Sequence, residues 1–304
     1  MALVDEHAEF QKQLCDAGVL AHLGRDGLYG RSGTFESIVT GLMRLVESTH
    51  ADLAPVSLTF PPVFPRESFE PTDYIASFPN LTGAIYTFLG DNKDHAALLA
   101  DRSAGNDWLP HLKPAGTFLM SAACHPLYGT MANTELEAER RFFVTGYCFR
   151  NEPSVDPMRM TSFRQFEVVY VGTPDEVAAG RELLIERALK NLGDLGLAIR
   201  PAAANDPFFG RAGRILAINQ REQNLKTELV VNMYPSDEEG TAIGSGNYHL
   251  DHFGAPYDIR TADGGVAHSA CFGYGLERVT LALLRTHGLD TAAWPADVRN
   301  LLGL

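Results

Sequence analysis

Residues 141–172 constrain the fold most, because two strand-like runs are separated by a short polar loop. The runs are "RFFVTGYCFR" (141–150) and "FRQFEVVYVG" (163–172), and both are rich in aromatic and apolar residues. Residues 151–161 between them hold two prolines and alternating polar side chains, which predicts a loop. The second run is therefore expected to return as the partner strand of the first.

The rest of the chain alternates helix-like and strand-like segments. Helices are predicted at 35–50, 173–193 and 275–288, and a Thr-x-x-Glu capping box at 134–137 predicts a further short helix. Strands are predicted at 82–90, 115–129, 213–219, 226–234 and 240–250, and residues 51–65 form a short extended run that ends in prolines. Strands joined by short polar turns indicate an α+β fold, with a mainly antiparallel sheet flanked by helices.

Composition and charge exclude several classes of protein. The chain has 304 residues, 45% of them hydrophobic, without repeats or long linkers, so residues 1–304 are expected to form a single domain. Residues 1–30 would be a short helical extension. The acidic start and the lack of an apolar run of ~18 residues favour a cytoplasmic protein without a membrane span. Four cysteines are too few for a disulfide scaffold, and a net charge of −13 opposes general attraction to nucleic acid.

The side chains around the 151–161 loop suit a nucleoside triphosphate. Arg150 and Glu152 are two residues apart, so they point to the same face, and Arg159 and Phe163 flank the start of the returning strand. A guanidinium binds phosphate, a carboxylate accepts from an exocyclic amine, and an aromatic ring stacks on a purine. The alternative is a solvated Arg–Glu pair beside a core phenylalanine.

A second stretch, "HSACFGYGLERVTLALL", strengthens the nucleotide interpretation. Gly273 and Gly275 precede a helix whose first turn carries Arg278. Backbone can therefore approach a ligand closely while an arginine reaches into the same cleft. A Gly-x-Gly turn alone is weak evidence, but it occurs here together with Phe-Arg-x-Glu and Arg-x-x-x-Phe.

"FRNE", "RMTSF" and "GYGLER" resemble motifs 2 and 3 of the class II aminoacyl-tRNA synthetases, and residues 35–65 resemble their dimer-forming motif 1. The resemblance implies a synthetase-like catalytic core and a homodimer. It also implies that Arg150 and Arg278 are catalytic and hold the α- and γ-phosphates of ATP, with Arg159 near the γ-phosphate. Glu152 would bind the adenine amine and Phe163 would stack on adenine. Cys271 and Phe272 depart from the usual motif 3, where a glycine leads.

Three possible metal ligands lie in segments expected to line the same sheet. They are Cys124, Glu167 and Cys271, and thiolates select zinc; three protein ligands with one open position are typical of a catalytic zinc site. Isolated cysteines are more often small buried apolar residues. His249-x-x-His252 is a rival metal site, although its flanks look like strand and turn.

"SACFGYGLER" and "GSGNYHLDHFG" are similar to the zinc-dependent seryl-tRNA synthetases of methanogens and, more closely, to the amino acid:[carrier protein] ligases. This resemblance implies one Zn²⁺ per chain on Cys124, Glu167 and Cys271, with the amino group of a small amino acid, glycine or alanine, at the open position. It places substrate contacts at Ser245 and Asn247. It leaves Cys15 and Cys148 without a role and makes the histidines structural or supporting groups.

The implied reaction forms an aminoacyl-adenylate from ATP and then transfers the aminoacyl group to an acceptor. Glu228 is the candidate ligand of Mg²⁺. The expected acceptor is the phosphopantetheine thiol of a carrier protein, docked on the basic cluster of Arg211, Arg214 and Arg221. A tRNA acceptor is disfavoured by the negative charge and by the short segments that flank the motifs, which leave no room for a tRNA-binding domain. A minimal aminoacyl-tRNA synthetase and a catalytically idle nucleotide-binding paralogue remain as alternatives.

Overall fold

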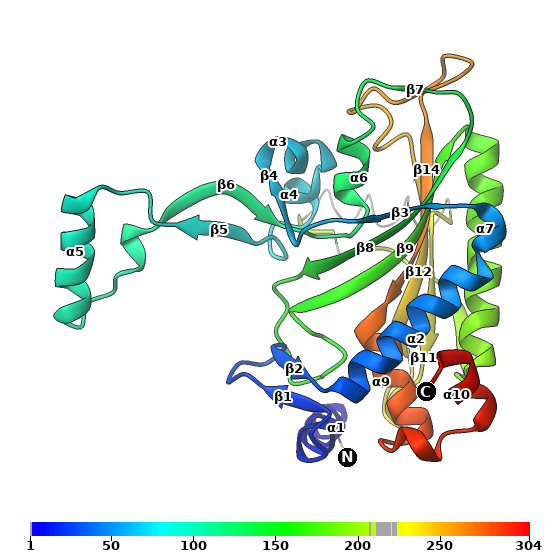
Figure 1. The fold of residues 1–304 in the computed structure, drawn as a ribbon, viewed down its shortest axis with the longest axis horizontal. Helices are drawn as coiled ribbons and strands as arrows, with labels where there is room; N and C mark the ends of the chain where they lie inside the picture. Colours follow the sequence, from blue (N-terminus) through cyan, green and yellow to red (C-terminus); the bar gives the residue numbers. More distant parts are fainter. Residues whose placement is uncertain (1, 207, 211–219, 221–223) are drawn as a thin grey trace.

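A seven-stranded sheet forms the centre of the molecule, and helices cover it (Figure 1). The computed structural model describes residues 2–206, 208–210, 220 and 224–304. The strand order is β10-β11-β12-β14-β9-β8-β3, and every neighbouring pair is antiparallel except β3 and β8. The mainly antiparallel α+β prediction is thus confirmed. The strands are β3 (Val56–Thr59), β8 (Arg140–Phe149), β9 (Ser162–Gly172), β10 (Ile199–Ala203), β11 (Lys226–Val231), β12 (Thr241–Leu250) and β14 (His268–Gly275).

The hairpin of β8 and β9 confirms the strand–loop–strand prediction for residues 141–172. Its register pairs Phe149 with Ser162 and Arg140 with Val171, so the loop lies where the prolines are. The Arg150 N–H donates to the Thr161 carbonyl, 2.9 Å away, and closes the base of the loop.

One face of the sheet is covered by long helices that enclose the larger hydrophobic core. Phe166, Val168 and Tyr170 of β9 contribute to this core together with residues of the helices. A second core on the opposite face includes Val169 and Cys271. The helices of the larger core are α1 (Leu3–Asp16), α2 (Gly33–Thr49), α7 (Pro174–Asp194), α9 (Leu276–His287) and α10 (Ala296–Leu302).

Helix α7 begins where its capping residues predict. The Thr173 side chain accepts from the Glu176 N–H at 3.4 Å, and the Glu176 carboxylate accepts from the Thr173 N–H at 2.9 Å. These reciprocal bonds satisfy N–H groups that a helix start otherwise leaves unpaired. The helix ends at Asp194, one residue beyond the predicted Gly193.

One predicted element is wrong, and another is too long. The Thr-x-x-Glu pattern at 134–137 does not begin a helix, because Thr134 Oγ1 donates to the Met131 carbonyl and residues Glu135–Leu136 form β7, which pairs with β13 (Arg260–Thr261). The predicted strand at 115–129 ends early, since β6 (Lys113–Leu119) is followed by helix α6 (His125–Gly129), which has Pro126 in its first turn. The predicted strand at 213–219 lies outside the described residues.

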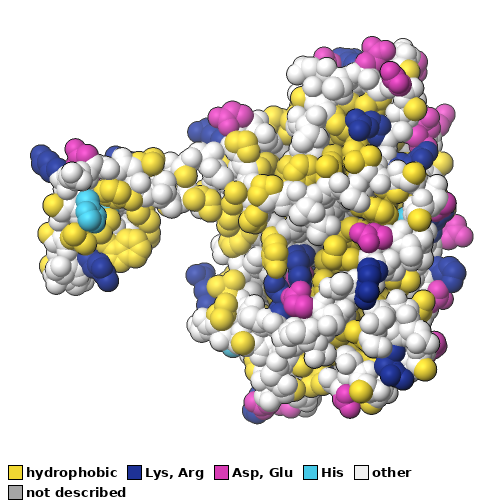
Figure 2. Space-filling view, viewed as in Figure 1, with side chains coloured by type: hydrophobic (Ala, Val, Ile, Leu, Met, Phe, Trp, Pro, Cys, Tyr) yellow, Lys and Arg dark blue, Asp and Glu magenta, His cyan; other side chains and the backbone are white. Residues whose placement is uncertain are grey.

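A projecting arm was not predicted. It consists of β5 (Ala84–Thr87), α5 (Asn92–Ser103), η3 (Leu109–His111) and β6, and it extends away from the central sheet (Figure 1). Hydrophobic side chains gather on the arm (Figure 2), and α5 has no buried residue. The arm joins the body through β4 (Val63–Pro65), which pairs with β6.

The remaining short elements connect these layers. They are β1 (Leu20–His22), β2 (Tyr29–Arg31), η1 (Ala51–Leu53), α3 (Arg66–Phe69), η2 (Glu70–Thr72), α4 (Tyr74–Ser77) and η4 (Thr291–Ala293). No helix among the described residues is long and apolar enough to cross a membrane. The expected homodimer contact through residues 35–65 and the single-domain assignment stay predictions.

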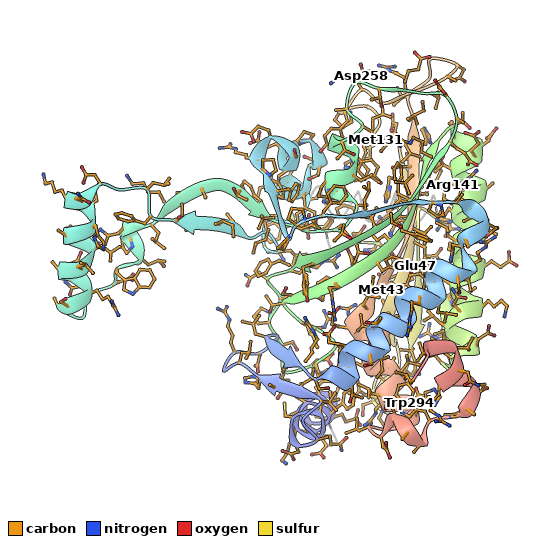
Figure 3. The ribbon with its side chains drawn as sticks, in the orientation of Figure 1. Met43, Glu47, Met131, Arg141, Asp258 and Trp294 are labelled. Atoms are coloured by element: carbon orange, nitrogen blue, oxygen red, sulfur yellow. The ribbon has the colours of Figure 1, made fainter. Side chains whose placement is uncertain are left out.

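The C-terminal helix α10 packs unusually closely against α2. Met43 and Glu47 of α2 and Trp294, which precedes α10, are seen in Figure 3. A Cβ on Gly41 of α2 would collide with the main-chain carbonyl of Leu302. The absence of a side chain at position 41 is therefore required for this contact.

We expect Gly41→Ala to destabilise the protein by about 1–3 kcal/mol, because backbone atoms of α10 must shift to admit the methyl group. Gly33→Ala in the same helix is the matched control. No atom lies within 4 Å of the Cβ that it would add, so this change should be neutral or slightly stabilising. Urea denaturation of both variants measures the difference, and equal stabilities would contradict the packing argument.

Candidate active site

A cavity of about 610 Å³ lies over the face of the sheet opposite the long helices. Its position follows from the two-residue alternation of strands. On β9, Phe163, Gln165 and Glu167 line the cavity. Phe166 and Val168, which flank Glu167 in the sequence, enter the helix-covered core instead. Alternation thus separates the polar cavity residues from the core residues within one strand.

Three buried acidic groups meet at the floor of this cavity. The sulfur atoms of Cys124 and Cys271 and a carboxylate oxygen of Glu167 lie within 4.8 Å of one another. Cys271 on β14 faces Val169 of β9, two residues from Glu167, and Cys124 precedes α6. The structure therefore brings together the three residues that the sequence suggested as metal ligands.

The chemistry of this cluster fits a divalent cation. Glu167 Oε2 is buried without a hydrogen-bond partner among the described residues. Burial raises the pKa of the Glu167 carboxyl, and the hydrogen bond with Cys271, burial and the charge of Glu167 together raise the pKa of the Cys124 thiol. A cation would reverse both effects, because it stabilises the thiolate and carboxylate forms.

Neither histidine of the rival pair belongs to the group of possible metal ligands found among the described residues. His249 Nδ1 lies 2.9 Å from Ser269 Oγ, while His252 Nε2 lies 3.2 Å from the Thr72 carbonyl. His249 Nε2 lies 3.6 Å from Cys271 Sγ, so this ring supports a cluster ligand. Burial lowers the pKa of His249 to about 3, and the ring is therefore neutral near pH 7.

The two remaining cysteines are free thiols outside the cluster. Cys148 is buried, and its Sγ donates to Gln165 Oε1 at 3.0 Å. Gln165 Oε1 also accepts from the Ala123 N–H at 3.1 Å, next to Cys124. Cys148 thus helps to hold a residue beside the cluster, a role that sequence reasoning did not find.

Arg150, Phe163 and Arg278 line the same cavity, as their nucleotide-binding assignment requires. The Arg150 guanidinium lies 5.4 Å from the centre of the Phe163 ring, and Arg150 Nε has no partner among the described residues. Glu152 and Arg159 instead pair with each other at 3.4 Å and are not among the cavity-lining residues that the structure describes.

Arg278 is held rigidly by the backbone. Its Nε donates to the Met158 carbonyl at 2.8 Å and its Nη1 to the Ala242 carbonyl at 2.9 Å. Burial lowers the pKa of Arg278, and the positive charges of Arg150 and Arg159 lower it further. Cations crowded in this way favour an anionic ligand, since a polyanion removes their mutual repulsion.

The candidate substrate residues line the cavity on the next strands. Ser245 Oγ donates to Asn247 Oδ1 at 3.0 Å, and Asn247 Nδ2 lies 3.6 Å from Cys271 Sγ. Glu228 also lines the cavity, opposite Ser245, and its Oε1 lies 3.2 Å from Lys226 Nζ. The candidate Mg²⁺ ligand is thus already paired with a cation.

Four charged cavity residues, Asp73, Asp206, Lys226 and Asp251, were missed in the sequence. Lys226 Nζ donates to Asp206 Oδ1 as well as pairing with Glu228. The spacing of Lys226 and Glu228 in "KTELVV" places both on one strand face and could have indicated Lys226, but nothing in the sequence marks Asp206. The proposed dock, Arg211, Arg214 and Arg221, lies outside the described residues.

Solved structures identify the class of the fold. A crystal structure of M. kandleri SerRS in complex with A. aeolicus tRNASec aligns with 96% of this chain and 60% of that one, at a TM-score of 0.82 and 20% identity. Seryl-tRNA synthetase from Pyrococcus horikoshii complexed with ATP aligns with 98% of this chain and 62% of that one, at a TM-score of 0.69 and 15% identity. The protein therefore has the class II seryl-tRNA synthetase catalytic fold, and it spans less than two thirds of these synthetase chains.

A curated relative identifies the family more narrowly. The chain is 42% identical over 284 residues, 93% of its own length and 86% of the relative's, to amino acid–[acyl-carrier-protein] ligase 1 of Bradyrhizobium diazoefficiens. The chain belongs to the amino acid–[acyl-carrier-protein] ligase family. No protein-family model matches it.

Proposed function

We propose that this protein activates a small amino acid with ATP and transfers it to the phosphopantetheine thiol of a carrier protein. The observation that carries the proposal is the meeting, in one cavity, of Arg150, Phe163 and Arg278 with Cys124, Glu167 and Cys271. One group of residues suits a nucleotide and the other suits a metal ion. The relative from B. diazoefficiens is named for ligation of an amino acid to an acyl-carrier protein.

In the first step, a carboxylate oxygen of the amino acid attacks the α-phosphorus of ATP. A P–O bond forms, the bond to the β-phosphate breaks, and pyrophosphate leaves. Positioning and charge neutralisation dominate such in-line displacements. Arg150 and Arg278 supply fixed positive charge, Phe163 stacks on adenine, and Glu152 accepts from the adenine amine.

Mg²⁺ accompanies ATP in this proposal, with Glu228 as its protein ligand. Glu228 is paired with Lys226 in the structure. Binding of Mg²⁺ to this carboxylate would therefore compete with the ammonium group, while Asp206 retains its own contact with Lys226. Arg159, paired with Glu152 at the loop, would reach the γ-phosphate only after that pair separates.

The metal proposed for Cys124, Glu167 and Cys271 is Zn²⁺, because two thiolates and one carboxylate suit this ion. When bound, it would supply a Lewis-acid position for the amino group of the substrate. Ser245 and Asn247 lie beside this position and would limit the space for a side chain, which favours glycine or alanine.

In the second step, the phosphopantetheine sulfur attacks the carbonyl carbon of the aminoacyl-adenylate. The C–S bond forms, the bond to the phosphate oxygen breaks, and AMP leaves with the electron pair while the thiol loses its proton. Such a thiol stands on a long flexible arm, so it needs only a narrow path to the cavity. A catalytic core is sufficient for this transfer.

We expect the purified protein to contain about one zinc per chain and Cys124→Ala and Cys271→Ala to lose it, since two ligands cannot hold the ion as three do. Cys15→Ala is the matched control, because this free thiol lies on α1, outside the cluster. Elemental analysis by mass spectrometry provides the measurement. Full zinc in both cluster variants would refute the site.

We expect amino-acid-dependent exchange of labelled pyrophosphate into ATP, and a loss of about 100-fold or more in Arg150→Met and Arg278→Met, because both remove charge that neutralises phosphate. Arg260→Met is the control: its guanidinium pairs with Asp258 at the surface. A screen of twenty amino acids identifies the substrate. No exchange with any of them, with zinc and magnesium supplied, would favour an idle nucleotide-binding paralogue.

We expect labelled amino acid to appear on carrier protein that bears phosphopantetheine and not on the same carrier without it. The physical reason is that only the prosthetic thiol can form the thioester. Total tRNA in a parallel reaction should stay unlabelled. Stable label on tRNA, with none on the carrier, would instead identify a minimal aminoacyl-tRNA synthetase.

A further inference from the structure

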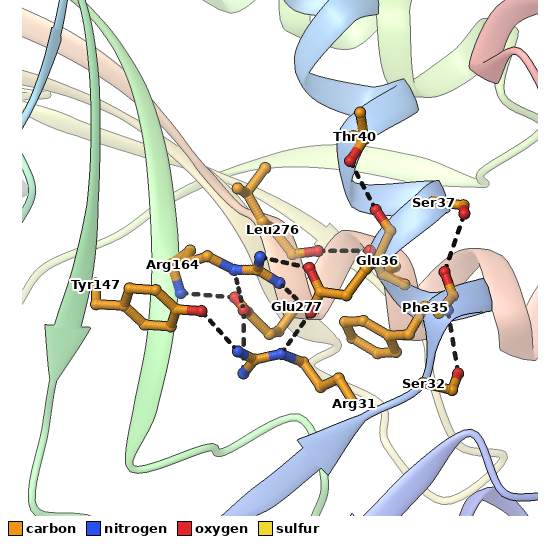
Figure 4. Close-up of polar contacts among 12 residues, drawn as sticks. Arg31, Ser32, Phe35, Glu36, Ser37, Thr40, Tyr147, Arg164, Leu276 and Glu277 are labelled. Carbon is orange, nitrogen blue, oxygen red and sulfur yellow. Dashed lines mark hydrogen bonds and ion pairs between the residues drawn. The ribbon is translucent and has the colours of Figure 1, made fainter.

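Behind the cavity, four charged residues from four elements form a partly buried ion-pair network (Figure 4). Arg164 of β9 donates through Nη1 and Nη2 to both carboxylate oxygens of Glu36 on α2, at 2.6 and 3.0 Å. Its Nε donates to Glu277 Oε1 of α9 at 2.7 Å. Arg31 of β2 adds a bond to Glu36 at 2.8 Å and an ion pair with Glu277 at 3.5 Å.

The guanidinium groups of Arg31 and Arg164 and the carboxylates of Glu36 and Glu277 compensate one another. Glu277 is 1% exposed, so its carboxylate depends on Arg164 and Arg31 for the solvation it has lost. Burial opposes ionisation of Glu36, but hydrogen bonds from Arg164 and Arg31 outweigh it and lower the pKa of Glu36. Removal of one of the four side chains would leave a charge in this network uncompensated.

None of these four residues is among the cavity-lining residues that the structure describes, yet two of them are chain neighbours of residues that are. Arg164 follows Phe163, and Glu277 precedes Arg278. The Arg164 N–H itself donates to Glu277 Oε2 at 2.7 Å, so one carboxylate binds both the side chain and the backbone of Arg164. This bond joins the backbone beside Phe163 to the first turn of α9, which carries Arg278.

The bonds of Arg164 to two carboxylates have a specific geometry, because each runs in a fixed direction from the planar guanidinium. A guanidinium that bonds two carboxylates in fixed directions defines the relative position of three elements more closely than apolar contacts alone. Tyr147 completes the arrangement, since its hydroxyl accepts from Arg31 Nη2 at 2.8 Å and its ring lies 5.5 Å from the Arg164 guanidinium. Position and orientation of β9 against α9 are thus set by polar contacts at this point.

We infer that Arg164, Glu277 and Glu36 are positioning residues that fix the separation of Phe163 and Arg278 and thereby set the affinity for ATP. The inference rests on the proposed function only in assigning Phe163 to adenine and Arg278 to phosphate. A ligand that bridges two such points loses affinity at both when their separation fluctuates. The same change should leave the amino acid site unaffected, because Glu167 and Cys271 lie further along β9 and β14 from the network.

The test compares Glu277→Gln and Arg164→Lys with the wild type in direct titrations with Mg-ATP and in pyrophosphate exchange. Glutamine keeps the shape of Glu277 but not its charge, and lysine keeps the charge of Arg164 but cannot reproduce its planar, bidentate bonds to Glu36. We expect the Kd and KM for ATP to rise about tenfold in both variants, with the KM for the amino acid changed less than about twofold. Glu36→Gln, at a half-exposed position, should fold in any case and raise the ATP constants about threefold.

Arg187→Met provides the control for a merely structural effect. Arg187 bonds both carboxylate oxygens of Asp52 at 2.6 Å and the Thr49 carbonyl at 2.8 Å, at the opposite end of α2 and outside the described lining of the cavity. The Arg187→Met variant should leave the Kd for ATP unchanged. An equal rise in Arg187→Met, or an unchanged ATP Kd in folded Glu277→Gln and Glu36→Gln, would overturn the inference.

The titration also separates this inference from the proposed reaction. Wild-type protein that binds ATP but catalyses no exchange would refute the reaction, whereas the ATP Kd of the variants would still decide the positioning role. Wild-type protein that does not bind ATP would overturn both.

Discussion

Side-chain alternation along β9 is the constraint on which the rest of the structure depends. Successive residues of a strand point to opposite faces, so Phe163 and Glu167 enter the cavity while Arg164 and Phe166 face the helices. A register shift of one residue would exchange the two sets and bury the cavity residues in the helix-covered core. The ion pairs of Arg164 with Glu36 and Glu277 hold the strand in the observed register, because no neighbouring β9 residue could make them.

The cavity that results holds two groups of side chains with different ligand preferences. Arg150 and the rigidly held Arg278 favour an anion, whereas two thiols and a carboxylate favour a cation. An amino acid and ATP together carry a phosphate chain at one end and an amino group at the other. The distribution of charge across one cavity thus agrees with the substrates proposed for a member of this ligase family.

The net charge of the whole chain, −13, does not describe this cavity. Acidic groups at the surface coexist with arginines in the cavity, where the backbone carbonyls of Met158 and Ala242 accept hydrogen bonds from Arg278. Local geometry, rather than composition, decides which ligand a site attracts. The exposed apolar residues of the projecting arm are likewise a local feature that composition does not reveal.

Local patterns in the sequence were enough to determine the β8–β9 hairpin and helices α2, α7 and α9, because these depend on periodicity and caps within a few residues. They failed where partners came from distant segments: Glu135–Leu136, inside the expected capping box, became strand β7 because β13 pairs with it. Only the tertiary structure decided that Glu167 meets Cys124, that Asp206 holds Lys226, and that Arg164 bonds Glu36 and Glu277 rather than a ligand. The physical reason is that an arginine binds whichever anion the fold places within about 3 Å of its guanidinium, and that distance is set by chain segments more than a hundred residues apart.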